Sequence, residues 1–460
     1  MGVPPATGGS REDEMSHHEA PADRFRYDAY ELDPANAQLT CRYSVGDRHF
    51  FEQVTFAPGG DWGSAATAAA ARLVFLLAGV SYYKTSAPPV VDLGETATTA
   101  DERRFLRTFY TEGLAEFAHR NRLDLQATEF VGPDLARRDP AAGARADGRP
   151  LVPFGGGIDS IVTAEAVGAR HPGASLFVVS KFGDRFEAID RAAAATGLPV
   201  VRAEREVDPT VVRSAELGYL NGHVPVTGIL SAVAVMAAVL GGHDAVVMSN
   251  EWSSSFGNVV VDGRAVNHQW SKGLEFEEGF RRVLADTLDP APEYFSLLRP
   301  RSELWVAARF AALDRYHRVF RSCNRAFHID RAKRLDRWCG RCDKCCFIDL
   351  ILSPFLPPAA LAAVFDGREP LADPSLADRF RALLSVGAGA KPFECVGEER
   401  ECRAAVRLAA ARPDRAATPL LQALAAEVGP APDGEDPDVL LAPLGPHCIP
   451  DAYAPEAQLV

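Results

Sequence analysis

A glycine-rich turn between an apolar run and a helical pattern constrains the fold of this 460-residue chain more than any other feature. The apolar run 151–154 is followed by Gly155, Gly156 and Gly157, and Asp159 and Ser160 then open the helical pattern. Backbone N–H groups in such a turn can bind an anion, and the helix dipole favours negative charge there. Asp159 and Ser160 could serve Mg²⁺ and phosphate oxygens. A plain turn with a capping aspartate is the alternative.

Alternating strands and helices follow this turn. Strands are predicted at 151–154, 175–180, 199–203 and 244–249, with helices at 159–170, 184–196 and 226–240. Such alternation predicts right-handed βαβ units in an α/β fold with a parallel, doubly wound sheet. Ligands of these sheets bind at the carboxyl ends of the strands. Ser180 with Lys181, and Asn250 with Glu251, fall there together with the glycine turn, which favours phosphate binding.

The chain before the turn has the pattern of a separate domain. Residues 1–24 are polar and carry Pro and Gly, so a disordered tail is expected. Residues 25–132 are predicted to form an N-terminal α+β domain, because 38–56 alternates as a hairpin around Gly46 and Asp47 and helical patterns follow. Those helical patterns lie at 65–77 and 102–120. Residues 133–150, rich in Pro, Ala, Gly and Arg, are interpreted as a linker.

The chain after the turn is predicted to contain the catalytic residues. Residues 151–410 are expected to form the catalytic domain, with a helical, cysteine-rich region at 323–346. Residues 411–460 are rich in Ala and Pro, and they are predicted to be a C-terminal extension with one helix at 419–428.

The bulk composition excludes several function classes. A formal net charge of −13 argues against a general nucleic-acid-binding protein. No secretory signal is predicted, and the apolar stretch 226–240 is shorter than the ~20 residues that a membrane span needs. Four of the nine cysteines crowd into 339–346, which indicates a cytoplasmic protein with a metal or thiol site rather than a disulfide scaffold. The oligomeric state does not follow from the sequence.

A cysteine cluster is the second chemical signal. Cys339, Cys342 and Cys345 form two overlapping CxxC steps, and Cys323 lies 16 residues before the first of them. Four thiolates are the ligands of a closed, structural Zn²⁺ site, with Zn–S distances of ~2.3 Å. An Fe–S cluster and free thiols are the alternatives. Cys346 is surplus to the set, and it is either a small buried apolar residue or a thiol available to chemistry.

The segment 267–272 has neither helical nor strand periodicity, which predicts an ordered functional loop. It carries Asn267, His268, Gln269 and Lys272, and a surface loop around a packed Trp270 is the alternative. Lysine is scarce in this chain, since only six of its 49 basic residues are lysines. Five of them fall in segments with other signals of function, namely Lys84, Lys181, Lys272, Lys344 and Lys391.

Together these motifs resemble known families. The strand, the run from Phe154 to Ser160 and the following helix resemble the pyrophosphate loop of the N-type ATP pyrophosphatases (the PP-loop superfamily, with a HUP-like fold). Gly155 stands where that loop usually begins with Ser, which removes one hydroxyl donor. The cysteine set is similar to the zinc knuckle of the 7-cyano-7-deazaguanine synthases. Five segments jointly resemble the UDP-N-acetylmuramoyl-L-alanyl-L-glutamate epimerase (MurL) family, namely 154–163, 249–253, 266–272, 338–349 and 391–397.

The MurL resemblance implies an enzyme of peptidoglycan precursor synthesis. It implies that ATP and Mg²⁺ are used to invert the terminal L-Glu of UDP-N-acetylmuramoyl-L-Ala-L-Glu through an acyl adenylate, with release of AMP and pyrophosphate. One alternative is another adenylating enzyme of the PP-loop type, such as an amide or nitrile synthase or a tRNA thiolase. The other is a non-catalytic ATP-binding module.

The resemblance and the residue types assign expected roles. Nucleotide and Mg²⁺ binding is expected of Phe154, Gly155, Gly156, Gly157, Asp159, Ser160, Ser180, Lys181, Asn250 and Glu251. Substrate binding is expected of Lys84, Asn267, His268, Gln269, Lys272 and Lys391. Lys344 is expected to neutralise phosphate or carboxylate charge in catalysis. Inversion needs two proton-transfer groups on opposite faces, and these are expected among Asp343, Cys346, Asp349, Glu394 and Cys395. Zinc is expected at Cys323, Cys339, Cys342 and Cys345.

Overall fold

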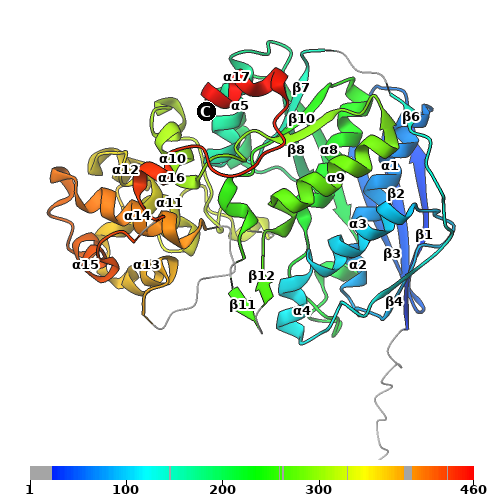
Figure 1. The fold of residues 1–460 in the computed structure, drawn as a ribbon, viewed down its shortest axis with the longest axis horizontal. Coiled ribbons are helices and arrows are strands. Elements are labelled where there is room, and N and C mark those ends of the chain that lie inside the picture. Colours follow the sequence, from blue (N-terminus) through cyan, green and yellow to red (C-terminus); the bar gives the residue numbers. More distant parts are fainter. Residues whose placement is uncertain are drawn as a thin grey trace, which may run out of the picture.

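The computed structural model describes residues 23–143, 147–257, 259–261, 264–328, 330–387, 396–432 and 434–459. A ten-stranded sheet forms its centre, in the order β14-β10-β7-β8-β9-β3-β2-β1-β4-β5. Helices cover the sheet, and the helices coloured yellow to orange form a separate group beside it (Figure 1).

One half of the sheet is parallel and is formed by the predicted βαβ units. Its strands are β7 (Pro150–Pro153), β8 (Ser175–Lys181), β9 (Val200–Val207), β10 (Ala245–Met248) and β14 (Glu293–Ser296). Helices α5 (Ile158–Gly168), α6 (Glu187–Thr196) and α8 (Val226–Gly241) connect these strands, with the short α7 (Pro209–Val212) after β9. The prediction of an α/β fold is therefore confirmed.

The other half of the sheet is formed by the N-terminal region. The hairpin β2 (Gln38–Val45) and β3 (Arg48–Phe56) turns at Gly46, and β1 (Arg24–Asp33) pairs antiparallel with β2. The short strands β4 (Val90–Asp92) and β5 (Glu129–Val131) extend this edge in parallel. β3 pairs antiparallel with β9, so the strands of 25–132 and the strands after residue 150 form one continuous sheet.

Alternate residues of the central strands face two different cores, as a doubly covered sheet requires. Leu151 and Phe177 face the core under α1 (Ala65–Ala78), α3 (Ala100–Thr111), α8 and α9 (Leu274–Thr287). Val152 and Leu176 face the core under α5 and the C-terminal helices. The predicted helix 102–120 is broken, because α3 ends at Thr111 and α4 (Ala115–Asn121) starts after Gly113.

The stretch Ala65–Tyr83, which combines α1 and α2 (Val80–Tyr83), is the one helix of the described residues that is long and apolar enough to cross a membrane. Its mean hydropathy is 1.5, but 83% of its 18-residue window is buried inside the structure, where α1 packs on α8. Its apolar character is therefore explained by its place in the core.

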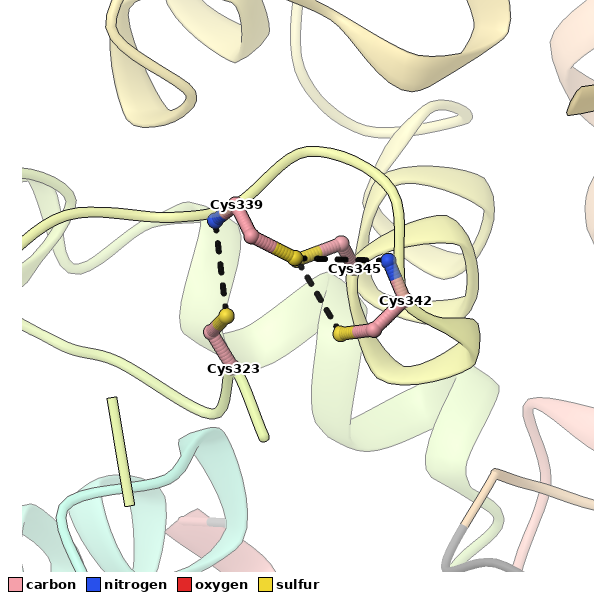
Figure 2. A group of neighbouring side chains, drawn as sticks. All are labelled: Cys323, Cys339, Cys342 and Cys345. Carbon is pink, nitrogen blue, oxygen red and sulfur yellow. Dashed lines mark hydrogen bonds between the residues drawn. The ribbon is translucent and has the colours of Figure 1, made fainter. Parts of the chain in front are cut away.

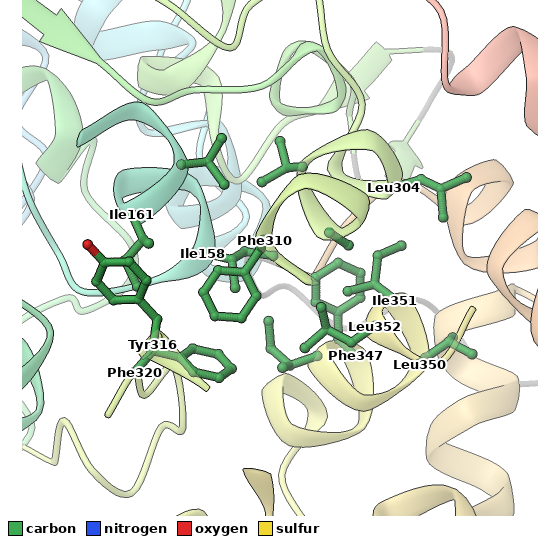
Figure 3. Packing of buried hydrophobic residues seen from close by; sticks show 14 of the residues in the cluster. Ile158, Ile161, Leu304, Phe310, Tyr316, Phe320, Phe347, Leu350, Ile351 and Leu352 are labelled. Atoms are coloured by element: carbon green, nitrogen blue, oxygen red, sulfur yellow. The ribbon is translucent and has the colours of Figure 1, made fainter. Parts of the chain in front are cut away.

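The C-terminal helices pack on α5 through α10 (Glu303–Ala311) and α11 (Asp343–Leu352). Ile158 and Ile161 of α5 lie in the same cluster as Phe310 and Phe347 (Figure 3). The remaining helices of this group are α12 (Pro358–Val364), α13 (Ala377–Leu384), α14 (Glu399–Ala410), α15 (Pro419–Val428) and α16 (Pro437–Leu440). Because α10 packs on both α5 and α11, it connects the helical group to the sheet.

The last helix of the described chain packs against a helix that covers the sheet. Helix α17 (Ala454–Leu459) packs on α5, as the red ribbon in Figure 1 shows. His171 lies 3.0 Å from a carboxylate oxygen of Glu456 and its ring stacks on Tyr453. Two small sheets complete the fold, one of β6 (Ala141–Ala142) with β13 (Leu288–Asp289) and one of β11 (Val259–Val261) with β12 (Arg264–Val266).

Candidate active site

A cavity of about 510 Å³ opens at the carboxyl ends of the parallel strands. Residues after β7, residues after β10 and the first part of α8 form its walls, and two lysines reach it from other elements. Its lining includes Phe154, Gly155, Gly157, Asp159, Ser160, Phe177, Val179, Thr227, Ser249, Asn250, Glu251, Lys272, Arg321, Ser322 and Lys344. The cavity thus collects segments that are far apart in the sequence.

The glycine turn borders the cavity with Gly155 and Gly157. Gly156 has φ +74°, and a Cβ there would lie 3.3 Å from the Cα of Ile189, so a larger residue would be strained and crowded. α5 starts with Gly157 as its N-cap, and no side chain of the described residues accepts a hydrogen bond there. Asp159 therefore does not cap the helix, and Ser160 donates to the Gly157 carbonyl oxygen at 3.0 Å. The N–H groups of this helix start are arranged as in an anion site.

Asp159 is the most perturbed acid of the cavity. Burial and the neighbouring Glu251 raise the pKa of Asp159 to about 7, although Lys344 and Lys272 act in the opposite direction. Its Oδ1 atom is buried and has no hydrogen-bond partner among the described residues, and the same holds for the hydroxyl of Ser249. Buried polar atoms without partners are costly, so a ligand that supplied a cation or donors would fit this wall.

Arg299, which the sequence analysis did not single out, joins two walls of the cavity. It is 1% exposed and pairs with Glu277 at 2.9 Å. Its Nη1 donates to the carbonyl oxygen of Glu251 at 2.9 Å, and its Nη2 donates to that of Lys272 at 2.5 Å. Arg299 thereby fixes the backbone of one acidic and one basic residue of the cavity. A single arginine after β14 carries no local sequence signal for this role.

Two further acids that the sequence analysis did not single out lie behind Glu251. Glu303 and Glu401 are buried, at 5% and 0% exposure. Burial raises the pKa of Glu401 to about 8, although a hydrogen bond from the Leu304 N–H acts against this shift. Burial and the charge of Glu251 raise the pKa of Glu303 well above its usual range. Two buried carboxyl groups that tend to hold protons therefore lie close enough to Glu251 to feel its charge.

The four predicted cysteine ligands converge (Figure 2). Their sulfur atoms all lie within 4.8 Å of one another, with Cys342 and Cys345 sulfurs at 3.4 Å and Cys339 and Cys345 sulfurs at 3.6 Å. A tetrahedral site with ~2.3 Å Zn–S bonds has sulfur–sulfur edges of ~3.8 Å. The cluster could therefore hold a metal such as zinc with small adjustments.

The cysteine cluster also shapes the cavity. Cys342 is the N-cap of α11, and Lys344 lies between two cluster cysteines at the start of that helix. Arg321 and Ser322 precede Cys323, and both line the cavity. A metal at the cluster would thus fix two segments of the cavity wall.

The predicted loop 267–272 lies beside the cavity and is tied to the N-terminal region. His268 Nδ1 forms a short hydrogen bond with a carboxylate oxygen of Glu116, and its ring lies 4.0 Å from that of His223. Burial raises the pKa of Glu116, but the hydrogen bond from His268 and nearby positive charge outweigh burial, so the net shift is downward. Burial, together with His268 and the charges of Lys272 and Lys84, lowers the pKa of His223 to about 4.

The remaining residues of this loop and the nearby lysines are engaged in local contacts. Lys272 Nζ donates to Gln269 Oε1 at 3.0 Å, and the Asn267 amide donates to the Ser254 carbonyl oxygen at 3.1 Å. Lys84 Nζ donates to Asn221 Oδ1 at 2.9 Å and to the Gly222 carbonyl oxygen at 3.1 Å. Lys84 therefore holds the loop that carries His223.

Other predicted site residues lie outside the cavity wall. Ser180 is buried on the face of β8 opposite Val179, and Lys181 is exposed at the strand end. Asp343 pairs with Arg379 at 2.6 Å. Cys346 is buried, which raises the pKa of its thiol.

Asp349 lies in the core of the helical group, where it accepts a hydrogen bond from the Leu371 N–H at 2.7 Å. Its pKa is raised well above the usual range by burial and the charge of Glu369. Lys391, Glu394 and Cys395 lie outside the described residues.

Comparison with known proteins assigns the family. The model of the MurL N-terminal domain matches residues 16–297, and that of the MurL C-terminal domain matches residues 319–438. The chain belongs to the MurL family. A MurL relative from Xanthomonas oryzae pv. oryzae (strain MAFF 311018) is 40% identical over 442 residues, which cover 93% of this chain and 95% of the relative. A second MurL relative, from Salinispora tropica, is 38% identical over 446 residues, which cover 94% of this chain and 95% of the relative.

Both relatives are named UDP-N-acetyl-alpha-D-muramoyl-L-alanyl-L-glutamate epimerase. No solved structure matches the chain. The N-terminal match ends at residue 297, directly after β14, and the C-terminal match begins at residue 319, so α10 lies between them. The N-terminal match therefore includes the whole ten-stranded sheet, while the C-terminal match includes the cysteine cluster and most of the helical group.

Proposed function

We propose that this chain is an ATP-dependent epimerase, which inverts the terminal L-Glu of UDP-N-acetylmuramoyl-L-Ala-L-Glu to D-Glu through an acyl adenylate. The observation that carries the proposal is the cavity in which an uncapped helix start, the buried Asp159 and the cations Lys272 and Lys344 converge. The substrate class comes from the names of the MurL relatives. The α/β fold and the glycine turn support membership of the PP-loop superfamily, and this membership is part of the proposal.

The cavity offers groups for each part of ATP. N–H groups around Gly155, Gly156 and Gly157, with the start of α5, would bind the leaving pyrophosphate. Apolar Phe177 and Val179 line the same cavity and would pack against the adenine. Ser160, Asn250, Ser180 and Lys181 are the further nucleotide-binding residues of this proposal, and Phe154 shapes the turn.

The carboxylates of the cavity are suitable ligands for Mg²⁺. Among the described residues, the buried Oδ1 atom of Asp159 has no hydrogen-bond partner, and Asp159 lies beside Glu251. Carboxylate oxygens are typical Mg²⁺ ligands. When bound, the ion would neutralise phosphate charge during transfer of the adenylyl group. Lys272 and Lys344 would balance the remaining negative charge. The four cysteines fit structural zinc, whose role would be to hold Lys344 and Ser322 in place.

Adenylation explains why an epimerase would bind ATP. A free carboxylate makes the neighbouring α-proton very weakly acidic, since its removal adds charge beside an existing anion. Attack of the carboxylate oxygen on the α-phosphorus of ATP releases pyrophosphate and cancels that charge. The α-carbon then loses its proton to a base, and the enolate oxygen is stabilised by cationic groups. Reprotonation on the opposite face and hydrolysis of the adenylate give D-Glu and AMP.

The experiment uses the full chain with ATP, Mg²⁺ and the UDP-linked dipeptide substrate in D₂O. We expect AMP, and D-Glu that carries deuterium at its α-carbon. Asp159→Asn should lower both products by ~10²–10³-fold, as expected for loss of a group that stabilises transition-state charge. The matched control is Asp378→Asn, because the Asp378 side chain is 98% exposed on α13. A folded wild-type chain that binds ATP but forms neither AMP nor deuterated product would refute the proposal.

A further inference from the structure

A second cavity, the arginine pocket, has a volume of about 230 Å³ and is formed by the start of α6 and by residues between 319 and 336. Five of its twelve lining residues are arginines, and only two are acidic. The arginines are Arg185, Arg191, Arg321, Arg331 and Arg334, and the acids are Glu187 and Asp336. The lining therefore carries an excess of positive charge, in a chain whose formal net charge is −13.

Only two of these arginines form a salt bridge with a carboxylate among the described residues. Arg191 pairs with Glu187, and Arg334 pairs with Asp184. The three arginines of the pocket without such a salt bridge in the described chain are Arg185, Arg321 and Arg331. Positive charges that line one cavity repel one another, so an anion that enters it is attracted by all of them.

Arg321 is held in place by its surroundings. It is 8% exposed, and its Nη1 donates to the carbonyl oxygen of Phe320 at 2.8 Å and to that of Arg318 at 3.3 Å. These bonds orient the guanidinium, yet its buried Nε has no hydrogen-bond partner among the described residues. A buried donor without an acceptor is costly. An anion at this guanidinium would supply the acceptor oxygens that the protein does not.

The arginine pocket adjoins the cavity at the glycine turn. Arg321 lines both, and the next residue, Ser322, lies against the turn, because a Cβ on Gly157 would be 3.3 Å from its Oγ. The ring centroids of Phe186, which lines the pocket, and Phe327, which lines the cavity, are 5.4 Å apart. A ligand whose reacting end lies in the cavity therefore has the arginine pocket as a neighbouring subsite.

The substrate of the proposed function has a second charged end that needs a subsite. Its glutamate has to reach the ATP phosphates, while a sugar, a lactyl group and an alanine separate this glutamate from the diphosphate of the UDP end. Each phosphorus of that diphosphate carries a negative charge, and arginine guanidinium groups bind phosphate oxygens in pairs. The pocket is smaller than the ~300–1,000 Å³ of sites that enclose a whole ligand. Its size therefore suits the diphosphate rather than the complete nucleotide.

We propose that the arginine pocket is a subsite for a diphosphate group, supplied by the UDP end of the substrate. The inference rests on the proposed function, because it names how the same site would select its substrate. The pyrophosphate released from ATP is another source of the same chemistry. Its proposed place is the glycine turn, so the two sources predict different effects when the pocket is changed.

Calorimetry with UDP as the probe tests the pocket without turnover. The full chain is titrated with UDP while ATP and Mg²⁺ occupy the other cavity, and no dipeptide is present. Arg185→Gln and Arg331→Gln should each raise the Kd for UDP by ~10-fold, the loss expected when a hydrogen bond to a charged group is removed. Both arginines are exposed, so the variants leave the core intact. The matched control is Arg337→Gln, because Arg337 is exposed nearby in the sequence but does not line the pocket.

Kinetics with a truncated substrate distinguish the two sources of the diphosphate. N-acetylmuramoyl-L-Ala-L-Glu lacks the UDP end, so the ratio of kcat/KM for the UDP-linked substrate to kcat/KM for the truncated one measures what the UDP end contributes. This ratio should fall by ~10-fold in Arg185→Gln and in Arg331→Gln. Product inhibition by pyrophosphate and the KM for ATP should keep their wild-type values in both variants.

Three outcomes would overturn the inference. The first is a wild-type chain that does not bind UDP, and the second is wild-type affinity for UDP in both variants. The third is weaker inhibition by pyrophosphate with unchanged selectivity for the UDP-linked substrate, which would assign the pocket to the phosphates of ATP. A wild-type chain that binds UDP through the pocket but forms no AMP would instead contradict the proposed function, so the two failures are distinguishable.

Discussion

The cysteine cluster and the Glu116–His223–His268 group are two sets of converging ligand-type side chains, and they differ in how the chain brings them together. Three of the four cysteines, Cys339, Cys342 and Cys345, lie within seven residues on one turn and the start of α11, and Cys323 lies only 16 residues before them. The second group combines residues 116, 223 and 268, which only the packing of α4 and α8 against one loop brings together. A site made of neighbouring residues is readable from sequence, whereas a site made by tertiary packing is not.

The largest expected effect is on the cysteine cluster. Cys342→Ser should remove about one zinc per chain and should destabilise the helical group by more than ~5 kcal/mol, since structural zinc supplies much of the folding energy of small zinc sites. ATP affinity should also fall, because Lys344 and Ser322 flank the cluster. Elemental analysis, thermal unfolding and ATP titration measure these effects.

Cys448→Ser is the matched control, because Cys448 lies outside the cluster. Loss of zinc with unchanged ATP affinity and stability would show that the cluster does not shape the cavity.

The next effect concerns Arg299, which connects two segments of the cavity wall that lie far apart in the sequence. Arg299→Met should lower the free energy of unfolding by ~3–5 kcal/mol, because it leaves the buried Glu277 carboxylate unpaired. It should also weaken ATP binding, since Arg299 holds the backbone of both Glu251 and Lys272. Chemical denaturation and ATP titration provide the measurements.

Arg104→Met, at a side chain 71% exposed, should change stability by less than ~1 kcal/mol. Equal stability losses in the two variants would contradict the role given to Arg299.

The smallest effect is a pH dependence of stability that comes from the buried carboxyl group of Glu401. The folded-state pKa of Glu401 is about 8, against 4.5 for the free side chain, so the folded chain keeps a proton that the unfolded chain loses between these values. Its contribution is fully present below about pH 4.5 and is lost as pH rises through 8, with a slope of at most ~1.4 kcal/mol per pH unit. Glu401→Gln should flatten this part of the stability profile. A steeper profile in the variant would show that the sign is wrong.

The sequence predicts the local elements of the fold well. The hairpin around Gly46, the βαβ units and the helix at 419–428 match the structure within a few residues. Periodicity and turn residues specify such elements locally. The sequence could not show that β3 pairs with β9, because strand pairing between distant segments depends on register and packing. The sequence alone therefore predicts a separate domain for the N-terminal strands.

The candidate site also contains some residues that motifs predict and others that only tertiary packing reveals. The glycine turn, Asp159 and the four cysteines follow from motifs, and the structure brings them to one edge of the sheet. Arg299, Glu303 and Glu401 have no motif, and their importance comes only from burial against Glu251 and its neighbours. Cys346 and Asp349 lie next to the cysteine motif in sequence, but α11 directs them into the apolar core.

The most direct measurement follows oxygen atoms from the substrate. The terminal glutamate of the UDP-linked dipeptide is labelled with ¹⁸O in its α-carboxylate and incubated with the full chain, ATP and Mg²⁺, and the masses of AMP and the recovered glutamate are determined. Adenylation followed by attack of water on the acyl carbon predicts one ¹⁸O in each AMP formed with D-Glu. D-Glu that keeps both labels and is formed without any AMP would contradict the acyl adenylate.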